Sequence, residues 1–227
     1  MGPIDLVVFD MAGTTVDDAG NLVLTSLVEA ARTCDLPGSA DELNAMMGMN
    51  KREVFTILAE RRAPAGSAEA GALAERALIA FIEHLRGVYE RSLRPLPGAE
   101  DTFRFLRARG IKIATDTGFE AQIGSMIVDR LGWLDRGLID TAIFSTDVPR
   151  GRPAPYMIFR AMERLGVLDV RRVMKLGDSP ADLEEGANAG CGEVIGVLSG
   201  AHTVATLGRY THTRIIGSVA ELPGLFD

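Results

Sequence analysis

Several features are scarce in this 227-residue chain, and each shortage narrows what the protein can be. Only two cysteines occur, Cys34 and Cys191, and they lie too far apart for a metal-like spacing, so we expect reduced thiols in a cytoplasmic protein. No apolar run approaches the roughly 18 residues of a membrane span. The first residues lack the basic stretch of a secretion signal. We therefore expect no membrane partner.

Positive charge is also in short supply. The formal net charge is −7, from 24 lysines and arginines against 31 aspartates and glutamates. Nucleic-acid binding requires a surplus of basic side chains that neutralise phosphates. We therefore exclude a general nucleic-acid binder. A small anionic substrate remains compatible, because it needs only a local group of donors.

Strands and helices alternate over most of the chain. An apolar strand at 4–9 is followed by helical spacing throughout 22–93. Further strands, each followed by a helix or loop, are expected at 111–114, 139–144, 173–177, 194–197 and 214–216. Strands alternating with helices predict an α/β fold, a Rossmann-like doubly wound parallel sheet. We predict a core formed by 1–16 and 94–227, with an inserted α-helical domain at 17–93.

Polar side chains stand at the ends of four of these segments. They are Asp10, Thr115 to Thr117, Arg152 in the loop after the third strand, and Asp178 with Asp182. The carboxyl ends of parallel strands meet at one edge of a sheet. Two aspartates from separate strands suit Mg²⁺, which prefers one or two carboxylates, waters and a phosphate. Taken singly, these residues also fit helix capping or a solvated surface.

The motifs at these strand ends resemble those of the haloacid dehalogenase superfamily. The matching segments, in order, are 8–14 (VFDMAGT), the Thr-Gly pair 117–118 and 177–182 (GDSPAD). The helical insert resembles that superfamily's C1 cap. The resemblance implies that Asp10 is a nucleophile that forms an aspartyl-phosphate. It also implies Mg²⁺ bound by Asp10, the Ala12 carbonyl and Asp178, with Asp182 in support.

Ala12 narrows the resemblance within the superfamily. Typical phosphatases there carry an aspartate at this place as acid and base, and a methyl group moves no proton. The third motif has Arg152 in place of the usual lysine, and we expect its guanidinium fork to hold phosphoryl oxygens. Both features resemble the phosphonatase branch, in which a cap lysine forms a Schiff base with a phosphono-aldehyde. Segment 47–51 (MGMNK) makes Lys51 the candidate. Implied substrate contacts are Ala12, Gly13, Met47, Thr115, Thr117 and Gly118.

Lys51 also has an ordinary interpretation, because a lysine at a helix start is usually solvated. Its chemistry would require a lowered pKa, reached through burial or neighbouring cations. The strand-end hydroxyl is open between Thr117 and Thr115. We expect Asp116, between them, to point away from the site, because a carboxylate would repel a phosphoryl group.

The chain departs from the branch at Val54, Gly20 and Phe119, where the branch has histidine, cysteine and tyrosine. Two alternatives therefore stay open. One is a phosphomonoesterase acting on a small phosphorylated metabolite. The other is a catalytically silent binding or regulatory protein with the same fold. The resemblance also makes a homodimer through the cap plausible, although no residue pattern shows it.

Overall fold

The computed structural model describes residues 2–226, and within them the strands form one parallel sheet of six. The strands are β1 (Leu6–Asp10), β2 (Lys112–Thr117), β3 (Thr141–Phe144), β4 (Val173–Gly177), β5 (Glu193–Val197) and β6 (Arg214–Ile216). Their order is β3-β2-β1-β4-β5-β6. This confirms the predicted α/β class. Strands β2 and β3 lie on one side of β1, and β4, β5 and β6 lie on the other, so the strand order reverses beside β1. Folds of this kind place their ligands at such a reversal.

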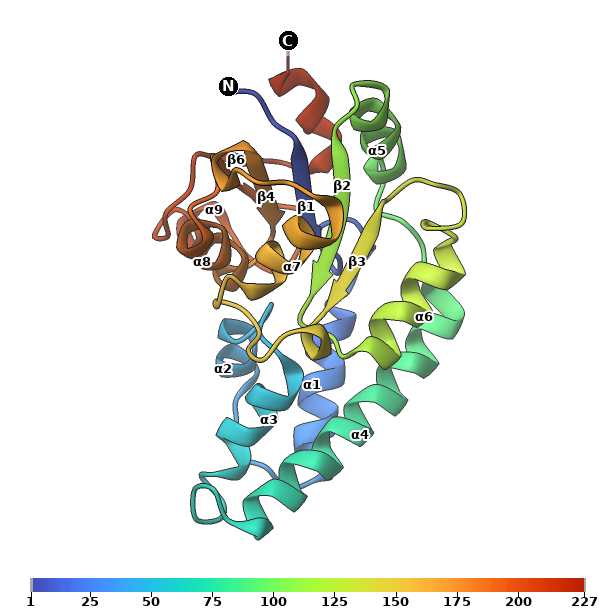
Figure 1. The fold of residues 1–227 in the computed structure, drawn as a ribbon. Helices are drawn as coiled ribbons and strands as arrows, with labels where there is room; N and C mark the ends of the chain where they lie inside the picture. The colour runs from blue at the N-terminus through green and yellow to red at the C-terminus, as the bar shows by residue number, and fades with distance from the viewer. Residues whose placement is uncertain (1, 227) are drawn as a thin grey trace.

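Helices cover both faces of the sheet (Figure 1). The helices packed around the sheet are α5 (Ala99–Ala108), α6 (Ala121–Leu131), α7 (Tyr156–Leu165), α8 (Pro180–Ala189) and the short α9 (Val204–Leu207). The apolar residues of α7 pack with Leu6 and Val8, whereas those of α5 and α6 pack with Phe9 on the opposite face. Each face is therefore dry, as a parallel sheet requires.

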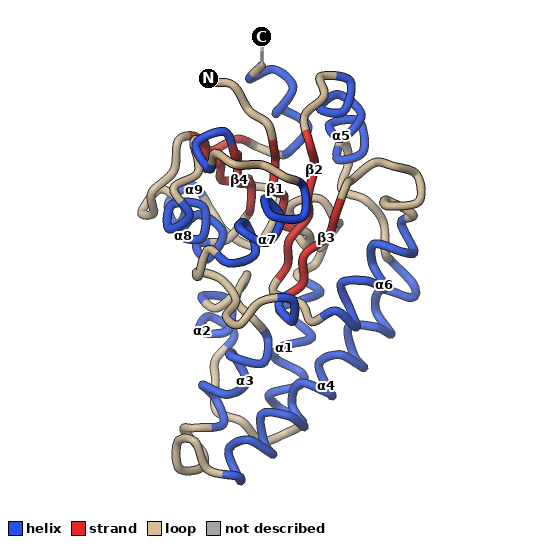
Figure 2. The backbone as a smooth tube through the Cα atoms, in the orientation of Figure 1, coloured by secondary structure: helices blue, strands red, loops and turns tan. Residues whose placement is uncertain are grey.

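Four helices, which we call the cap, lie beyond the carboxyl ends of the strands (Figures 1 and 2). They are α1 (Leu22–Thr33), α2 (Ala40–Ala45), α3 (Lys51–Ala59) and α4 (Ala68–Ser92). Three begin at side-chain caps that satisfy free backbone amides, from Ser39, Asn50 and Ser67. The long α4 packs against α1 and α3. The division into separate domains at 17 and 93 stays a prediction.

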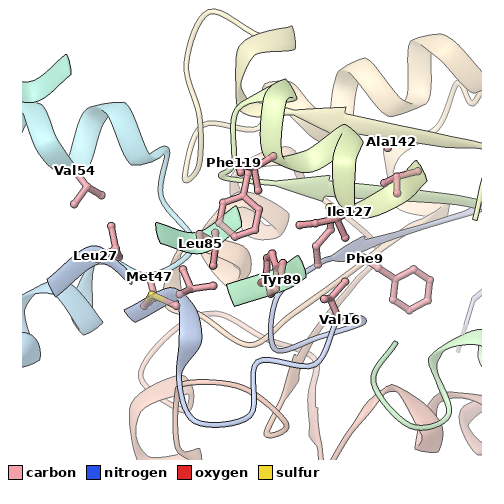
Figure 3. Packing of buried hydrophobic residues seen from close by; sticks show 14 of the residues in the cluster. Phe9, Val16, Leu27, Met47, Val54, Leu85, Tyr89, Phe119, Ile127 and Ala142 are labelled. Carbon is pink, nitrogen blue, oxygen red and sulfur yellow. The ribbon is translucent and has the colours of Figure 1, made fainter. Parts of the chain in front are cut away.

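One apolar cluster runs from the cap into the sheet. Figure 3 shows cap residues such as Leu27, Leu85 and Tyr89 with Phe9 and Phe119 of the rest of the chain. Aromatic rings continue this contact, because Phe119 packs on Phe81 of α4 with ring centroids 6.3 Å apart. The cap is thus seated on the strand ends by buried apolar surface.

Two local details differ from the sequence-based expectation. Strand β2 continues to Thr117 instead of ending at 114, because its pairing with β3 extends to Phe144. Short helical turns at Ser145–Asp147, Val170–Arg172 and Val219–Leu225 were not expected. In the described part of the chain, no helix is both long and apolar enough to cross a membrane.

Candidate active site

Asp10 is the last residue of β1 and begins a tight turn. The Thr15 hydroxyl donates to the Asp10 carbonyl over 2.8 Å, and the Gly13 amide donates to the Val16 carbonyl over 2.8 Å. Gly13 has a φ of 86°, and a Cβ there would lie 2.9 Å from Oδ2 of Asp178. Glycine is therefore required at this position both for the backbone and for the approach of the second aspartate.

Three buried carboxylates meet at this edge of the sheet. Asp10, Asp178 and Asp182 each offer an oxygen within 4.8 Å of the others. Burial and the charge of Asp182 raise the pKa of Asp10 to about 6, although Arg152 opposes the shift. Burial and the charge of Asp10 likewise raise the pKa of Asp178. A hard divalent cation would relieve this repulsion, so the residues fit Mg²⁺.

Asp178 and Asp182 are oriented by their own partners. Asp178 accepts the Ala201 amide over 2.8 Å and the Thr14 hydroxyl over 3.4 Å. Asp182 closes a capping box with Ser179 at the start of α8. The structural interpretation of Asp182 as a helix cap is thus correct, and its other oxygen, Oδ1, lies 2.8 Å from Nη1 of Arg152 and 3.2 Å from the Lys175 amine.

A small cavity lies between the strand ends and the cap. Its lining residues are Asp10, Ala12, Val23, Met47, Gly48, Lys51, Thr117, Gly118, Phe119 and Asp178. Cap and sheet therefore both contribute to one site. Most of the residues nominated from the sequence are brought together here.

Lys51 is the first residue of α3 and is buried, with 3% of its surface exposed. Its amine donates to the Met49 carbonyl over 3.0 Å and lies 5.8 Å from the centre of the Phe119 ring. Burial lowers the pKa of Lys51 to about 8, and Arg152 adds to the effect, whereas the charge of Asp10 opposes it. The solvated interpretation of this lysine is therefore wrong.

The two threonines at the end of β2, Thr115 and Thr117, differ in whether they reach the cavity. Thr117 lines the cavity and accepts the Phe119 amide over 3.2 Å. Thr115 is fully buried inside β2, beside Phe9 and Ala142, and lies outside the lining. Gly13, also expected to contact substrate, is outside the lining and lies close against Oδ2 of Asp178. Its expected contact with substrate stays a prediction.

Arg152 is fully buried behind Asp10 and does not line the cavity. Its Nη1 lies 2.7 Å from Asp10 and 2.8 Å from Asp182. We expected this guanidinium to hold phosphoryl oxygens, but its hydrogens are directed at carboxylates instead. Its visible role is to hold the nucleophile candidate, and any contact with a phosphoryl group stays a prediction.

Three further charged residues belong to this network: Lys175 and Glu185, which the sequence analysis missed, and Asp116, whose contacts it did not predict. Lys175 stands alone among apolar residues of a buried strand, which was a usable signal. Glu185 lies three residues after Asp182, on the same side of α8. Asp116 lies outside the cavity lining, in line with the expectation, and it contacts Arg152 and Lys175 on the same face of the sheet as Asp10.

Asp116, Asp182 and Glu185 form a second carboxylate group whose oxygens lie close enough to hold a metal ion. The Lys175 ammonium already lies 3.2 Å from Asp182 and 2.9 Å from Glu185. Burial would raise the pKa of Asp116, but the charges of Arg152 and Lys175 hold that pKa below its ordinary value. Two protein cations therefore occupy the space where a second metal would lie.

Sequence comparison shows which known proteins this chain is similar to. Residues 4–190 match the model of a family of hydrolases described as haloacid dehalogenase-like hydrolases. A phosphonoacetaldehyde hydrolase from Hahella chejuensis is 31% identical over all of this chain and 86% of its own length. One from Bacillus cytotoxicus is 32% identical over 87% of this chain and 76% of its own.

Solved structures share the fold at lower sequence identity. A hydrolase from Pseudomonas syringae superposes with a TM-score of 0.84 at 20% identity, covering 98% of both chains. A phosphonoacetaldehyde hydrolase-like protein from Oleispira antarctica gives 0.82 at 22% identity, covering 99% of this chain and 91% of its own. These likenesses concern the fold.

Proposed function

Because the chain belongs to the haloacid dehalogenase-like hydrolase family, we propose that this hydrolase is a Mg²⁺-dependent phosphonatase. Its substrate is phosphonoacetaldehyde or a related phosphono-aldehyde, whose C–P bond it cleaves. The proposal extends to this chain the activity for which the relatives from Hahella chejuensis and Bacillus cytotoxicus are named.

One observation carries the proposal. The Lys51 amine and the Asp10 carboxylate line the same cavity, although they come from the cap and from the sheet. Burial lowers the pKa of Lys51 to about 8, so a useful fraction of the amine is neutral near pH 7–8 and can attack a carbonyl. Phosphoester hydrolysis, in contrast, has no step in which a neutral amine attacks a carbonyl carbon.

The chemistry assigns one task to each side chain. The neutral Lys51 amine adds to the aldehyde, and the adduct takes up a proton from solvent and loses water to give a protonated imine. An oxygen of Asp10 then attacks phosphorus. The C–P bond breaks, and its electron pair enters the imine to leave an enamine on Lys51. Protonation at carbon and hydrolysis release the aldehyde, while water cleaves the aspartyl-phosphate to phosphate.

The carboxylates of Asp10 and Asp178 and the carbonyl of Ala12 would hold Mg²⁺. When bound, the ion neutralises the phosphoryl oxygens and lowers the cost of bringing an anion to a carboxylate. The Thr117 hydroxyl lines the cavity and can donate to the same group. Ala12 carries no acid, and none is needed at that place, because the leaving carbanion is taken up by the imine.

Reductive trapping tests the proposal. The chain has three lysines, Lys51, Lys112 and Lys175, so a trapped adduct can be mapped by peptide mass. Borohydride with phosphonoacetaldehyde and Mg²⁺ should inactivate the enzyme and label Lys51. Lys51→Arg should lose both labelling and C–P cleavage. Lys112→Arg is the matched control, because that amine bonds the Leu165 carbonyl at the opposite end of β2.

The two alternative functions, a phosphomonoesterase and a catalytically silent binding protein, predict different results in these assays. Rapid hydrolysis of small phosphate esters by both the wild type and Lys51→Arg, without C–P cleavage, would identify a phosphomonoesterase. Unchanged behaviour of Asp10→Asn in every assay would indicate a silent binding protein. Full C–P cleavage by Lys51→Arg would refute the imine.

A further inference from the structure

Asp116 is a buried carboxylate for which the proposed reaction has no direct use. It pairs in register with Asp10 across β1 and β2, so both side chains point to the same face of the sheet. Its surface is fully buried. One of its oxygens contacts Nη2 of Arg152 and the amine of Lys175. This single oxygen therefore bridges two cations directly behind the nucleophile candidate.

Each nitrogen of the Arg152 guanidinium lies near a carboxylate, and two of them, Nη1 and Nη2, donate hydrogen bonds, to Asp10 and Asp116. Nη1 contacts Asp10 and Asp182 at 2.7 and 2.8 Å, Nε lies 3.2 Å from Glu185, and Nη2 contacts Asp116. The planar fork of arginine fixes the relative directions of these contacts. Anchoring Nη2 on Asp116 consequently sets where Nη1 meets the Asp10 carboxylate.

Lys175 locks the same arrangement from β4. Its amine contacts Asp116, Asp182 and Glu185, so three of the four carboxylates around Arg152 are shared with it. Two like charges lie close together in a dry environment only if carboxylates stand between them. Asp116 is the carboxylate that reaches both cations from the sheet.

We propose that Asp116 is a positioning residue, which holds Arg152 and Lys175 together so that Arg152 keeps the Asp10 carboxylate aimed at the reacting phosphorus. The inference rests on the nucleophilic role of Asp10 in the proposed function. It holds equally for C–P and phosphoester substrates, because it concerns the nucleophile and not the leaving group.

The expected signature is a loss in kcat. Asp116 does not line the cavity, so its removal leaves the substrate contacts in place. A misaligned nucleophile instead slows the chemical step. Asp116→Asn keeps the size of the side chain and removes its charge. We expect kcat to fall at least about tenfold and KM to change less than about twofold.

Charge balance provides a second measurement. Lys175→Met alone leaves Asp116 and Glu185 with one cation fewer, and should also lower kcat. The double variant Asp116→Asn/Lys175→Met removes one charge of each sign. We expect its kcat to exceed that of Asp116→Asn, which is a non-additive rescue. If Asp116→Asn does not fold, the comparison is made between the double variant and Lys175→Met, with the double variant again expected to be faster.

Asp140→Asn is the control for the loss of an ion-paired carboxylate elsewhere, at the other end of the sheet, where the pair is partly exposed to solvent. Asp140 pairs with Arg107 at 2.9 Å and accepts the Ile113 amide, far from the cavity lining. This variant should lose stability and keep kcat. Wild-type kcat in folded Asp116→Asn, a change confined to KM, or a double variant no faster than its slower parent would overturn the inference. Activity surviving in Asp10→Asn would instead refute the proposed function itself.

Discussion

The backbone amide of Lys51, in the cap, donates to the carbonyl of Gly118, at the end of β2, over 3.3 Å. The contact brings the amine of Lys51 and the hydroxyl of Thr117 to the same cavity. It depends on close backbone approach. A Cβ on Gly118 would overlap the carbonyl oxygens of Gly48 and Met49.

Gly118→Ala should therefore hold the cap away from the strand ends. We expect kcat/KM to fall by about 10²-fold, because a displacement of roughly 1 Å can cost this much in a positioned site. Steady-state kinetics on phosphonoacetaldehyde measures the effect. Gly71→Ala in α4, where a Cβ would meet nothing, is the control. It should keep full activity and stabilise the helix by about 0.5–1 kcal/mol. Equal activity in the two variants would contradict the role of Gly118.

Replacing Lys51 with methionine should increase stability while abolishing imine formation. Burial depresses the pKa of Lys51 to about 8, so the buried cation opposes folding at neutral pH. The variant should gain about 1–3 kcal/mol in unfolding free energy at pH 7. Chemical denaturation measures the gain.

The pH dependence of that gain has a definite sign. Between about pH 8 and the unfolded lysine pKa near 10.4, the unfolded wild-type chain binds more protons than the folded one, so wild-type stability rises with pH. The advantage of Lys51→Met should accordingly shrink over this window. A constant advantage from pH 7 to 10.5 would mean that the amine is not buried in solution.

The pH dependence of imine formation should report the ionisation of the Lys51 amine. Only the neutral amine attacks an aldehyde, so the initial rate of borohydride-trapped adduct should rise with pH and level off above about pH 8. An exposed lysine would instead show a rise continuing toward about pH 10.4. Rapid-quench mass spectrometry of the Lys51 peptide, with total aldehyde held constant, distinguishes the two profiles.

Magnesium should stabilise the fold through the three carboxylates. Asp10, Asp178 and Asp182 repel one another when buried without a cation. At 100 times its dissociation constant, the ion should add about 2.7 kcal/mol. Asp178→Asn should lose most of this gain in a thermal unfolding assay. Asp101→Asn, an exposed carboxylate on α5, should retain it. Equal gains in all three proteins would place the ion elsewhere.

The alternation of strands and helices and the order of the motifs were readable in the sequence, because both depend on local pattern. Asp10 and Asp178 could be placed at one edge, since parallel strands share their carboxyl ends. Ala12 could be interpreted as a missing acid from its position alone. These inferences need only the order of segments along the chain.

Side-chain direction and burial required the tertiary structure. The choice of Thr117 over Thr115 depends on where β2 ends, which its pairing with β3 decides. The position of Arg152 behind Asp10, with Lys175 beside it, could not be predicted either, because strand register and α8 together bring four carboxylates to that face. The burial of Lys51, on which its chemistry depends, arises only when the cap packs on Gly118. Desolvation is a property of the surrounding atoms, and segments distant in sequence supply those atoms.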